Sequence, residues 1–129
     1  MTFIIYGRPI TKKNSQRIVT VGGHPKIIPS RQYREYEEKA LWQLRVSKRV
    51  LQELQTPIVG PVNVACVYYM PTRHKVDLLN LMEATMDILV RAGILEDDNS
   101  RVVASHDGCA VLYDKQQPRV EISITGKVE

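Results

Sequence analysis

Hydrophobic and polar residues alternate in two stretches of this chain, which predicts β-strands with one buried face. The stretch 62–70 is the stronger of the two, and its apolar face consists of Val62, Val64, Cys66, Tyr68 and Met70. The stretch 119–125 alternates as cleanly, which is typical of a half-buried antiparallel strand. Residues 2–6 are apolar and β-branched, and they predict a first strand that ends at Gly7-Arg8-Pro9.

Shorter stretches predict the rest of the sheet. Residues 17–21 and 26–28 flank Gly22-Gly23, a combination that indicates a β-hairpin with a glycine turn. Residues 101–104 and 109–113 are also strand-forming, and we interpret the polar residues between them as a bulge or an irregular edge.

Two segments predict helices. The first begins after Ser30, a preferred N-cap residue, and extends to about Glu53. The second begins at Asp77, another N-cap residue, and stops at Gly93, where a helix C-terminus favours glycine. At 100° per residue the second helix has one apolar side, formed by Leu78, Leu81, Met82, Met86, Ile88 and Leu89. Its opposite side carries Asn80, Glu83, Asp87 and Arg91, while Leu79 lies at the edge of the apolar side.

The order of these elements predicts an α+β fold, with a mixed or antiparallel sheet and two main helices. The 129 residues are enough for one domain with a sizeable core, covering 1–129. No apolar run is long enough to cross a membrane, and the N-terminus lacks a signal-peptide pattern, so we expect a cytoplasmic protein. We expect Cys66 and Cys109 to be free thiols, with a disulfide as the alternative.

The charge of the chain is divided unevenly, although the net charge is only +4. Residues 1–34 contain seven Lys or Arg and no acid, whereas residues 77–98 contain six acids and one base. Basic side chains neutralise phosphates, and carboxylates hold divalent cations by their oxygen atoms. Motifs for phosphate loops, serine nucleophiles and zinc sites are absent from the sequence. Metal-assisted hydrolysis of nucleic acid is therefore the enzymatic interpretation with positive support.

Motifs in both halves of the chain add to this interpretation. The acidic half contains Asp77-Leu78-x-Asn80-Leu81, then Asp87, then Asp97-Asp98-x-x-x-Val102. The basic half contains Gly7-Arg8-Pro9, then Lys12-Lys13-Asn14-Ser15, then Pro29-Ser30-x-x-Tyr33. In these motifs the chain resembles the RusA family of small phage and prophage Holliday junction resolvases, over nearly its whole length.

The resemblance implies a RusA-like fold and a homodimer that cuts four-way DNA junctions in recombination, repair or phage DNA processing. It implies Mg²⁺ as the cofactor, with Mn²⁺ able to substitute. The metal ligands would be Asp77 and Asp98, with Asp97 as a close alternative. We expect DNA contacts from Lys12, Lys13, Arg17, Arg73 and Lys75, although the loop around Lys12 is equally well interpreted as a solvated one.

Two positions depart from the family pattern. Where the family motif has its second acid, this chain has Leu79. Where the family has a catalytic lysine, this chain has Glu83. Because Glu83 lies one helical turn after Leu79, we hypothesise that its carboxylate is a surrogate ligand and a catalytic residue. The catalytic cation would then come from Lys75 or Arg73. The alternatives are a catalytically impaired protein that binds junctions or other DNA, and a structural DNA-associated module.

Overall fold

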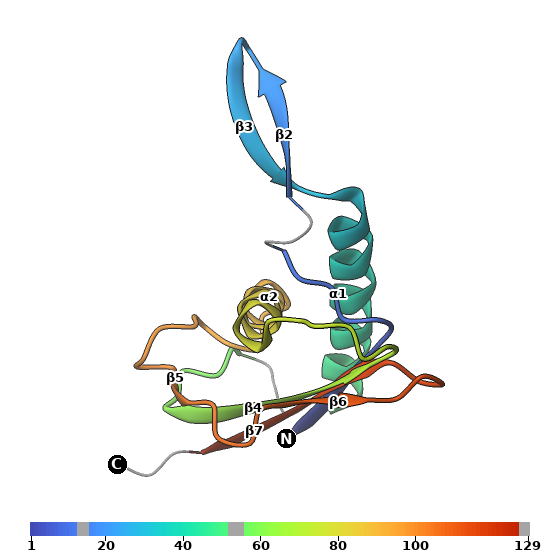
Figure 1. Ribbon diagram of the computed structural model, residues 1–129. Helices are drawn as coiled ribbons and strands as arrows, with labels where there is room; N and C mark the ends of the chain where they lie inside the picture. The colour runs from blue at the N-terminus through green and yellow to red at the C-terminus, as the bar shows by residue number, and fades with distance from the viewer. Residues whose placement is uncertain (13–15, 52–55, 127–129) are drawn as a thin grey trace.

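The structure is a computed structural model that describes residues 1–12, 16–51 and 56–126. It confirms the predicted α+β class, with two helices and a mixed sheet (Figure 1). The elements in chain order are β1 (Thr2–Tyr6), β2 (Gln16–Val21), β3 (His24–Pro29), α1 (Arg31–Leu51), β4 (Val62–Met70), α2 (Leu78–Arg91), β5 (Val103–Ser105), β6 (Ala110–Tyr113) and β7 (Arg119–Gly126).

The main sheet has the order β1-β7-β4-β5, and β6 also pairs with β4. Strand β7 is antiparallel to both β1 and β4, whereas β5 and β6 both run parallel to β4. The predicted alternation is confirmed in β4, whose five apolar positions are buried while the residues between them are half-buried. A sheet with one alternating face of this kind needs a cover on that face only.

The prediction of strand residues at 101–104 and 109–113 with an irregular interruption is confirmed in outline, because β5 and β6 both pair with β4 in parallel and are separated by residues 106–109. Where the backbone pairing with β4 is interrupted, side chains make hydrogen bonds instead. The Oδ1 atom of Asn63 on β4 accepts bonds from the Ser105 hydroxyl at 2.6 Å and from the Asp107 N–H at 2.7 Å. Further along, the N–H of Cys66 donates to the sulfur of Cys109 at 3.3 Å.

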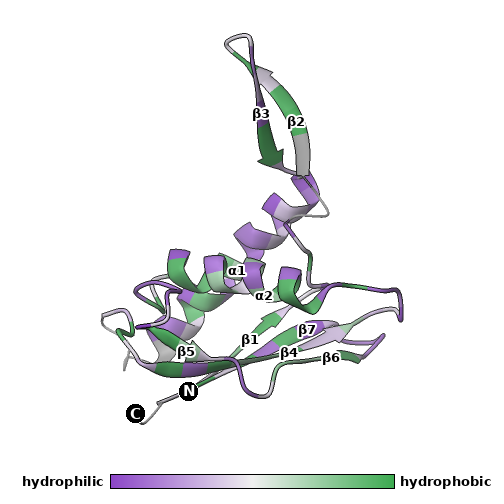
Figure 2. Ribbon diagram, turned by 60° about the vertical axis from the view of Figure 1, so that its left-hand side comes forward, coloured by the Kyte–Doolittle hydropathy of each residue, from purple (hydrophilic) through white to green (hydrophobic). Residues whose placement is uncertain are grey.

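Both helices lie on the same side of the main sheet (Figures 1 and 2). The core between the layers joins Phe3 and Ile5 from β1, the buried face of β4, and Leu81, Ile88 and Leu89 from α2. The half of α1 next to the hairpin is hydrophilic, as its colour in Figure 2 shows. Among the described helices, none is both long enough and apolar enough to cross a membrane.

Strands β2 and β3 form the predicted hairpin, which projects away from the sheet and helices (Figure 1). Gly22 and Gly23 make its turn with φ of 58° and 79°, which other residues adopt only with strain. Ile18 and Ile27 are directly opposite partners in the two strands, and they are 72% and 64% exposed. The hairpin thus presents an apolar pair to solvent.

The predicted helix ends are confirmed where the structure describes them. The Ser30 hydroxyl accepts the N–H of Tyr33 at 3.2 Å, and the Asp77 carboxylate accepts the N–H of Leu79 at 2.9 Å. Gly93 follows the end of α2 with φ of 74°. Helix α1 is described to Leu51, so the predicted end at Glu53 lies outside the described residues.

Candidate active site

Helix α2 and its N-cap carry two of the predicted site acids, Asp77 and Glu83, and the motif residue Asp87. Asp77 caps its first turn, Glu83 is exposed near its middle, and Asp87 is half-buried one turn later. Ten residues separate Asp77 from Asp87, which is a rise of about 15 Å along a helix. The helix therefore holds its carboxylates apart, and other elements determine which of them has a neighbour.

The turn with Asp97 and Asp98 is fixed by the connector before β4. The N–H of Ile58 donates to Ile94 O at 2.9 Å, and Ile58 O accepts the N–H of Glu96 at 2.9 Å. Gly60 lies so close to the backbone of Val102 that an added Cβ would come within 2.4 Å of the Val102 carbonyl oxygen. A residue without a side chain is required there, and this contact holds the far end of the acidic turn.

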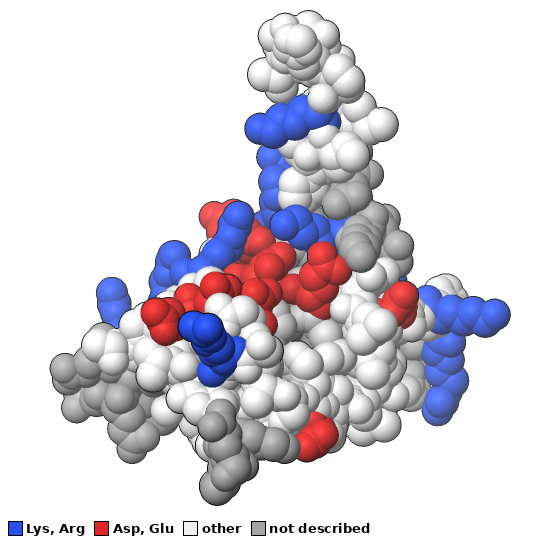
Figure 3. Space-filling model, turned by 90° about the vertical axis from the view of Figure 1, so that its left-hand side faces the viewer, with Lys and Arg blue, Asp and Glu red and all other residues white. Residues whose placement is uncertain are grey.

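The turn and the second half of α2 enclose one pocket of about 290 Å³, which we call the acidic pocket. Its lining consists of Lys12, Asp87, Val90, Arg91, Asp97 and Asp98. The Lys12 ammonium lies 3.7 Å from the Asp87 carboxylate, and Arg91 forms an ion pair with Glu37 of α1. Figure 3 shows the acids gathered on this face of the molecule, with Lys and Arg side chains around them.

The two adjacent aspartates of the turn differ in proton affinity. Partial burial raises the pKa of Asp98, and the carboxylates of Asp97 and Asp87 raise it further. The pKa of Asp97 is lowered, chiefly because its carboxylate accepts the N–H of Asp98, at 2.7 Å. The two shifts differ in sign because Asp97 accepts hydrogen bonds that favour its charged form, whereas Asp98 is partly buried beside other carboxylates.

Tyr33 is a residue of this region that sequence reasoning did not assign to the site. Its side chain is buried, and its hydroxyl has no hydrogen-bond partner among the described residues. Burial raises its pKa, and the charges of Glu37 and Asp87 contribute to that shift. Asp87 was seen in the sequence as part of the motif, but its contact with Lys12 joins segments 75 residues apart, and no local pattern predicts such a contact.

The chemistry of the acidic pocket suits Mg²⁺, which prefers oxygen ligands, and Asp87, Asp97 and Asp98 offer them on one wall. The side chains are not already arranged as a metal site. Across residues 1–12, 16–51 and 56–126, no group of three or more His, Cys, Asp or Glu could hold a metal ion. Asp77 and Glu83 do not line the pocket.

Leu79, at the edge of the apolar side, does not pack into the core, because its side chain is 71% exposed. The first turn of α2 does reach the core through Leu78 and Leu81, so Leu79 lies on the exposed side of that turn. The face with Asn80, Glu83 and Asp87 is the less buried side of the helix, as predicted.

The predicted DNA-contacting residues fall in three places. Lys12 lines the acidic pocket. The guanidinium of Arg73 stacks on the ring of Tyr113 at 4.5 Å, and Lys75 is exposed in the segment that leads into α2. Lys13 lies outside the described residues, and Arg17 is placed on β2 by its backbone alone.

Comparison with known protein families identifies a match over most of the chain. The family described as endodeoxyribonuclease RusA matches residues 7–125 of the 129-residue chain. This range contains both acidic segments and the basic residues from Arg8 onward. No curated protein matches the chain.

Proposed function

Because the chain belongs to the RusA endodeoxyribonuclease family, we propose that it cuts four-way DNA junctions in recombination, repair or phage DNA processing. The observation that carries the proposal is the acidic pocket, where three aspartates meet two cations. The basic side chains around the pocket neutralise the flanking phosphates.

Dependence on Mg²⁺ is part of the proposal, with Mn²⁺ as a substitute. The carboxylates of Asp98 and Asp87 would hold the ion, with Asp97 beside them. Such an ion would supply charge stabilisation at the scissile phosphate. Asp77, the ligand that the family motif implies, and Glu83, the hypothesised surrogate, lie outside the pocket lining, so in this proposal they would bind a cation along the first half of α2.

We also propose that the protein works as a homodimer, because resolving a junction requires paired cuts on two strands. The hairpin offers a surface for this contact. A two-stranded hairpin is marginally stable in water by itself, and this one exposes both Ile18 and Ile27. A second copy that covers this pair would stabilise both hairpins.

A second candidate function is supported by one position. Leu79 occupies the position of a family motif acid. Its side chain is exposed, but it has no oxygen atom that could bind a metal ion. In this alternative the chain is a junction-binding protein with impaired chemistry.

The test is cleavage of a synthetic four-way junction, with linear duplex of the same sequence as the control substrate. Reactions with Mg²⁺, with Mn²⁺ and with EDTA would be compared on denaturing gels. We expect paired cuts in the junction that depend on the metal, and no cuts in the duplex. Binding of the junction without cuts under every condition would support the second candidate. Absence of both cutting and binding would contradict both functions.

A further inference from the structure

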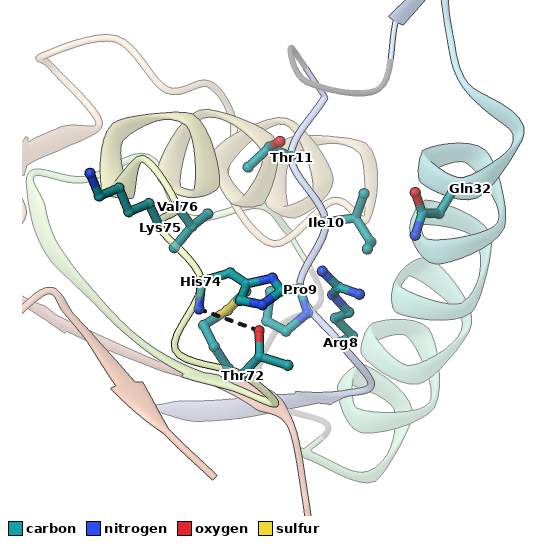
Figure 4. A pocket seen from close by; sticks show the side chains of 10 residues that line it. Arg8, Pro9, Ile10, Thr11, Gln32, Thr72, His74, Lys75 and Val76 are labelled. Atoms are coloured by element: carbon teal, nitrogen blue, oxygen red, sulfur yellow. Dashed lines mark hydrogen bonds between the residues drawn. The ribbon is translucent and has the colours of Figure 1, made fainter. Parts of the chain in front are cut away.

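A second pocket of about 190 Å³ lies at the other end of α2, and we call it the basic pocket (Figure 4). It is built by three segments that are distant in sequence: the strand exit at residues 8–11, the start of α1, and the connector from β4 to α2. Its lining consists of Arg8, Pro9, Ile10, Thr11, Gln32, Met70, Thr72, His74, Lys75 and Val76.

Two polar side chains of this pocket, Arg8 and Lys75, are cationic donors, and its other polar side chains can donate as well as accept. Figure 4 shows the side chains of Arg8 and His74 facing each other above Pro9, with Gln32 reaching in from α1. The Lys75 ammonium points away from Arg8, toward the rim. None of the ten lining residues is acidic, and within the described part of the chain no carboxylate pairs with Arg8. An unpaired guanidinium among N–H donors favours an oxyanion.

The lining of the pocket distinguishes between the parts of a nucleotide. Bases stack mainly on Phe, Tyr or Trp side chains, and the lining of this pocket contains none of these. The guanidinium of Arg8 instead suits the oxygen atoms of a phosphate group.

The position of the pocket relates it to the candidate active site. Val76 lines it, and Asp77 is the next residue. On its other side, the segment that carries Arg8 passes over α2 and brings Lys12 into the acidic pocket. Four residue steps of at most about 3.5 Å separate Arg8 from Lys12, so the two side-chain origins lie within about 14 Å. Phosphates along one DNA strand rise about 3.4 Å each, so this distance covers about four of them.

We propose that the basic pocket binds one backbone phosphate of the cut strand, within about four nucleotides of the scissile phosphate, through Arg8 and His74. This inference rests on the proposed function and adds a strand-positioning site to it. Holding a second phosphate of the same strand fixes the register of the DNA over the acidic pocket. Arg8 is then a positioning residue, because it touches the DNA away from the reacting atoms.

The experiment combines single neutral methylphosphonates, placed in turn along one junction strand, with three variants of the full chain. Arg8→Gln and His74→Gln alter the pocket, and Arg45→Gln is the matched control on the exposed face of α1. Binding is measured by fluorescence anisotropy in EDTA, so cleavage plays no part. Thermal melts check that each variant is folded.

For the wild type we expect one methylphosphonate position to weaken binding about tenfold. Arg8→Gln should weaken binding of the unmodified junction to a similar degree and lower the salt slope by about 0.9. The affinity of the Arg8→Gln variant should also be unchanged by the methylphosphonate at that position, whereas the affinity of Arg45→Gln should fall as that of the wild type does.

Equal sensitivity of Arg8→Gln and the wild type at every position would overturn the phosphate site, while the proposed function would stand. A wild-type protein that does not bind the junction would instead overturn the proposed function, and the phosphate site with it.

Discussion

The Lys12 ammonium lies 3.7 Å from the carboxylate of Asp87, although the two residues are far apart in the sequence. The contact joins the segment after β1 to the middle of α2 and brings a cation into the acidic pocket. It does not neutralise the whole pocket, because the pKa of Asp98 stays raised under the influence of burial, Asp97 and Asp87. The charged form of Asp98 is therefore unfavourable in the folded protein and lowers its stability.

Asp98→Asn should make the folded protein more stable at neutral pH. A folded-state pKa above the ordinary 3.8 means that the charged form of Asp98 is disfavoured by folding. The protonated carboxyl favours the folded state, and this contribution is lost as pH rises through the folded pKa. An uncharged Asn avoids the loss. The gain in Tm over the wild type should be present at pH 7 and vanish at about pH 3.

Asp114→Asn is the control of opposite sign. Arg119 holds the pKa of Asp114 below its ordinary value, so this carboxylate stabilises the folded state above pH 3.8. Its removal should lower Tm at neutral pH. If Asp98→Asn and Asp114→Asn changed Tm at neutral pH in the same direction, the electrostatic argument for the pocket would be contradicted.

Asp77→Asn should abolish junction cleavage and leave junction affinity unchanged. Asn is as good an N-cap residue as Asp, so the bond to the Leu79 N–H and the start of α2 should persist. Only the negative charge is lost, and phosphate contacts come from Lys and Arg. Gel cleavage assays and anisotropy measure the two properties separately. Glu35→Gln on α1 is the control, and wild-type cleavage by Asp77→Asn would exclude a catalytic role for Asp77.

The local parts of this fold could be predicted from the sequence because they depend on near neighbours. Alternation defined the bounds of β4, and Ser30, Asp77 and Gly93 marked helix ends. Gly22-Gly23 identified the hairpin turn. Each of these signals acts within a few residues, so no knowledge of the tertiary structure was needed.

The parts that were missed depend on contacts between distant segments. The ion pair of Lys12 with Asp87 and the clamp of Gly60 on Val102 exist only once the layers are packed. The exposure of Leu79 likewise depends on how α2 is turned against the core. The hydrogen bonds that hold the loop between β5 and β6 depend on Asn63 of a different strand. The composition of the acidic pocket therefore could not be predicted, although its acids were identified.

Cys109 should react with iodoacetamide at a pH well below that of an ordinary thiol. The thiol of Cys66 and its N–H both donate to the Cys109 sulfur, and together with nearby His106 they lower the pKa of Cys109 to about 6. The alkylation rate, followed by mass spectrometry with peptide mapping, should rise with a midpoint near this pH. In Cys66→Ala the midpoint should move toward the ordinary 9.0. A wild-type midpoint near 9.0 would show that Cys66 does not stabilise the thiolate.

Ile27→Asp should convert the proposed homodimer to monomers. Ile27 and its cross-strand partner Ile18 are exposed on the projecting hairpin, and burial of such a side chain contributes roughly 1.5–3 kcal/mol. A charge at this position would oppose the contact. Sedimentation velocity at several concentrations gives the mass of each variant. Trp42→Asp is the matched control, because Trp42 is 68% exposed on α1. Dissociation by Trp42→Asp alone would assign the interface to α1 instead.

Leu79→Asp restores the missing motif acid, and the structure indicates that the fold will tolerate it. Leu79 is 71% exposed and is the second residue of α2, so its replacement removes little packing. A carboxylate in the first turn interacts favourably with the helix dipole, typically by about 0.3–1 kcal/mol. Any change in activity of this variant can therefore be attributed to the site, provided that thermal melts show no loss of stability.

The effect of Leu79→Asp on cleavage decides between the two candidate functions when it is paired with Glu83→Gln. Glu83 lies one turn after Leu79, about 6 Å along the axis, and its longer side chain can extend back toward the helix N-terminus. If Glu83 is a surrogate ligand, the wild type cleaves junctions, Glu83→Gln loses most of that activity, and Leu79→Asp compensates in the double variant. If the wild type is inert and Leu79→Asp alone gains metal-dependent cleavage, the natural chain is a binder that lacks one ligand. Wild-type cleavage by Glu83→Gln would contradict the surrogate role, because the site would then work with neither acid at these two positions.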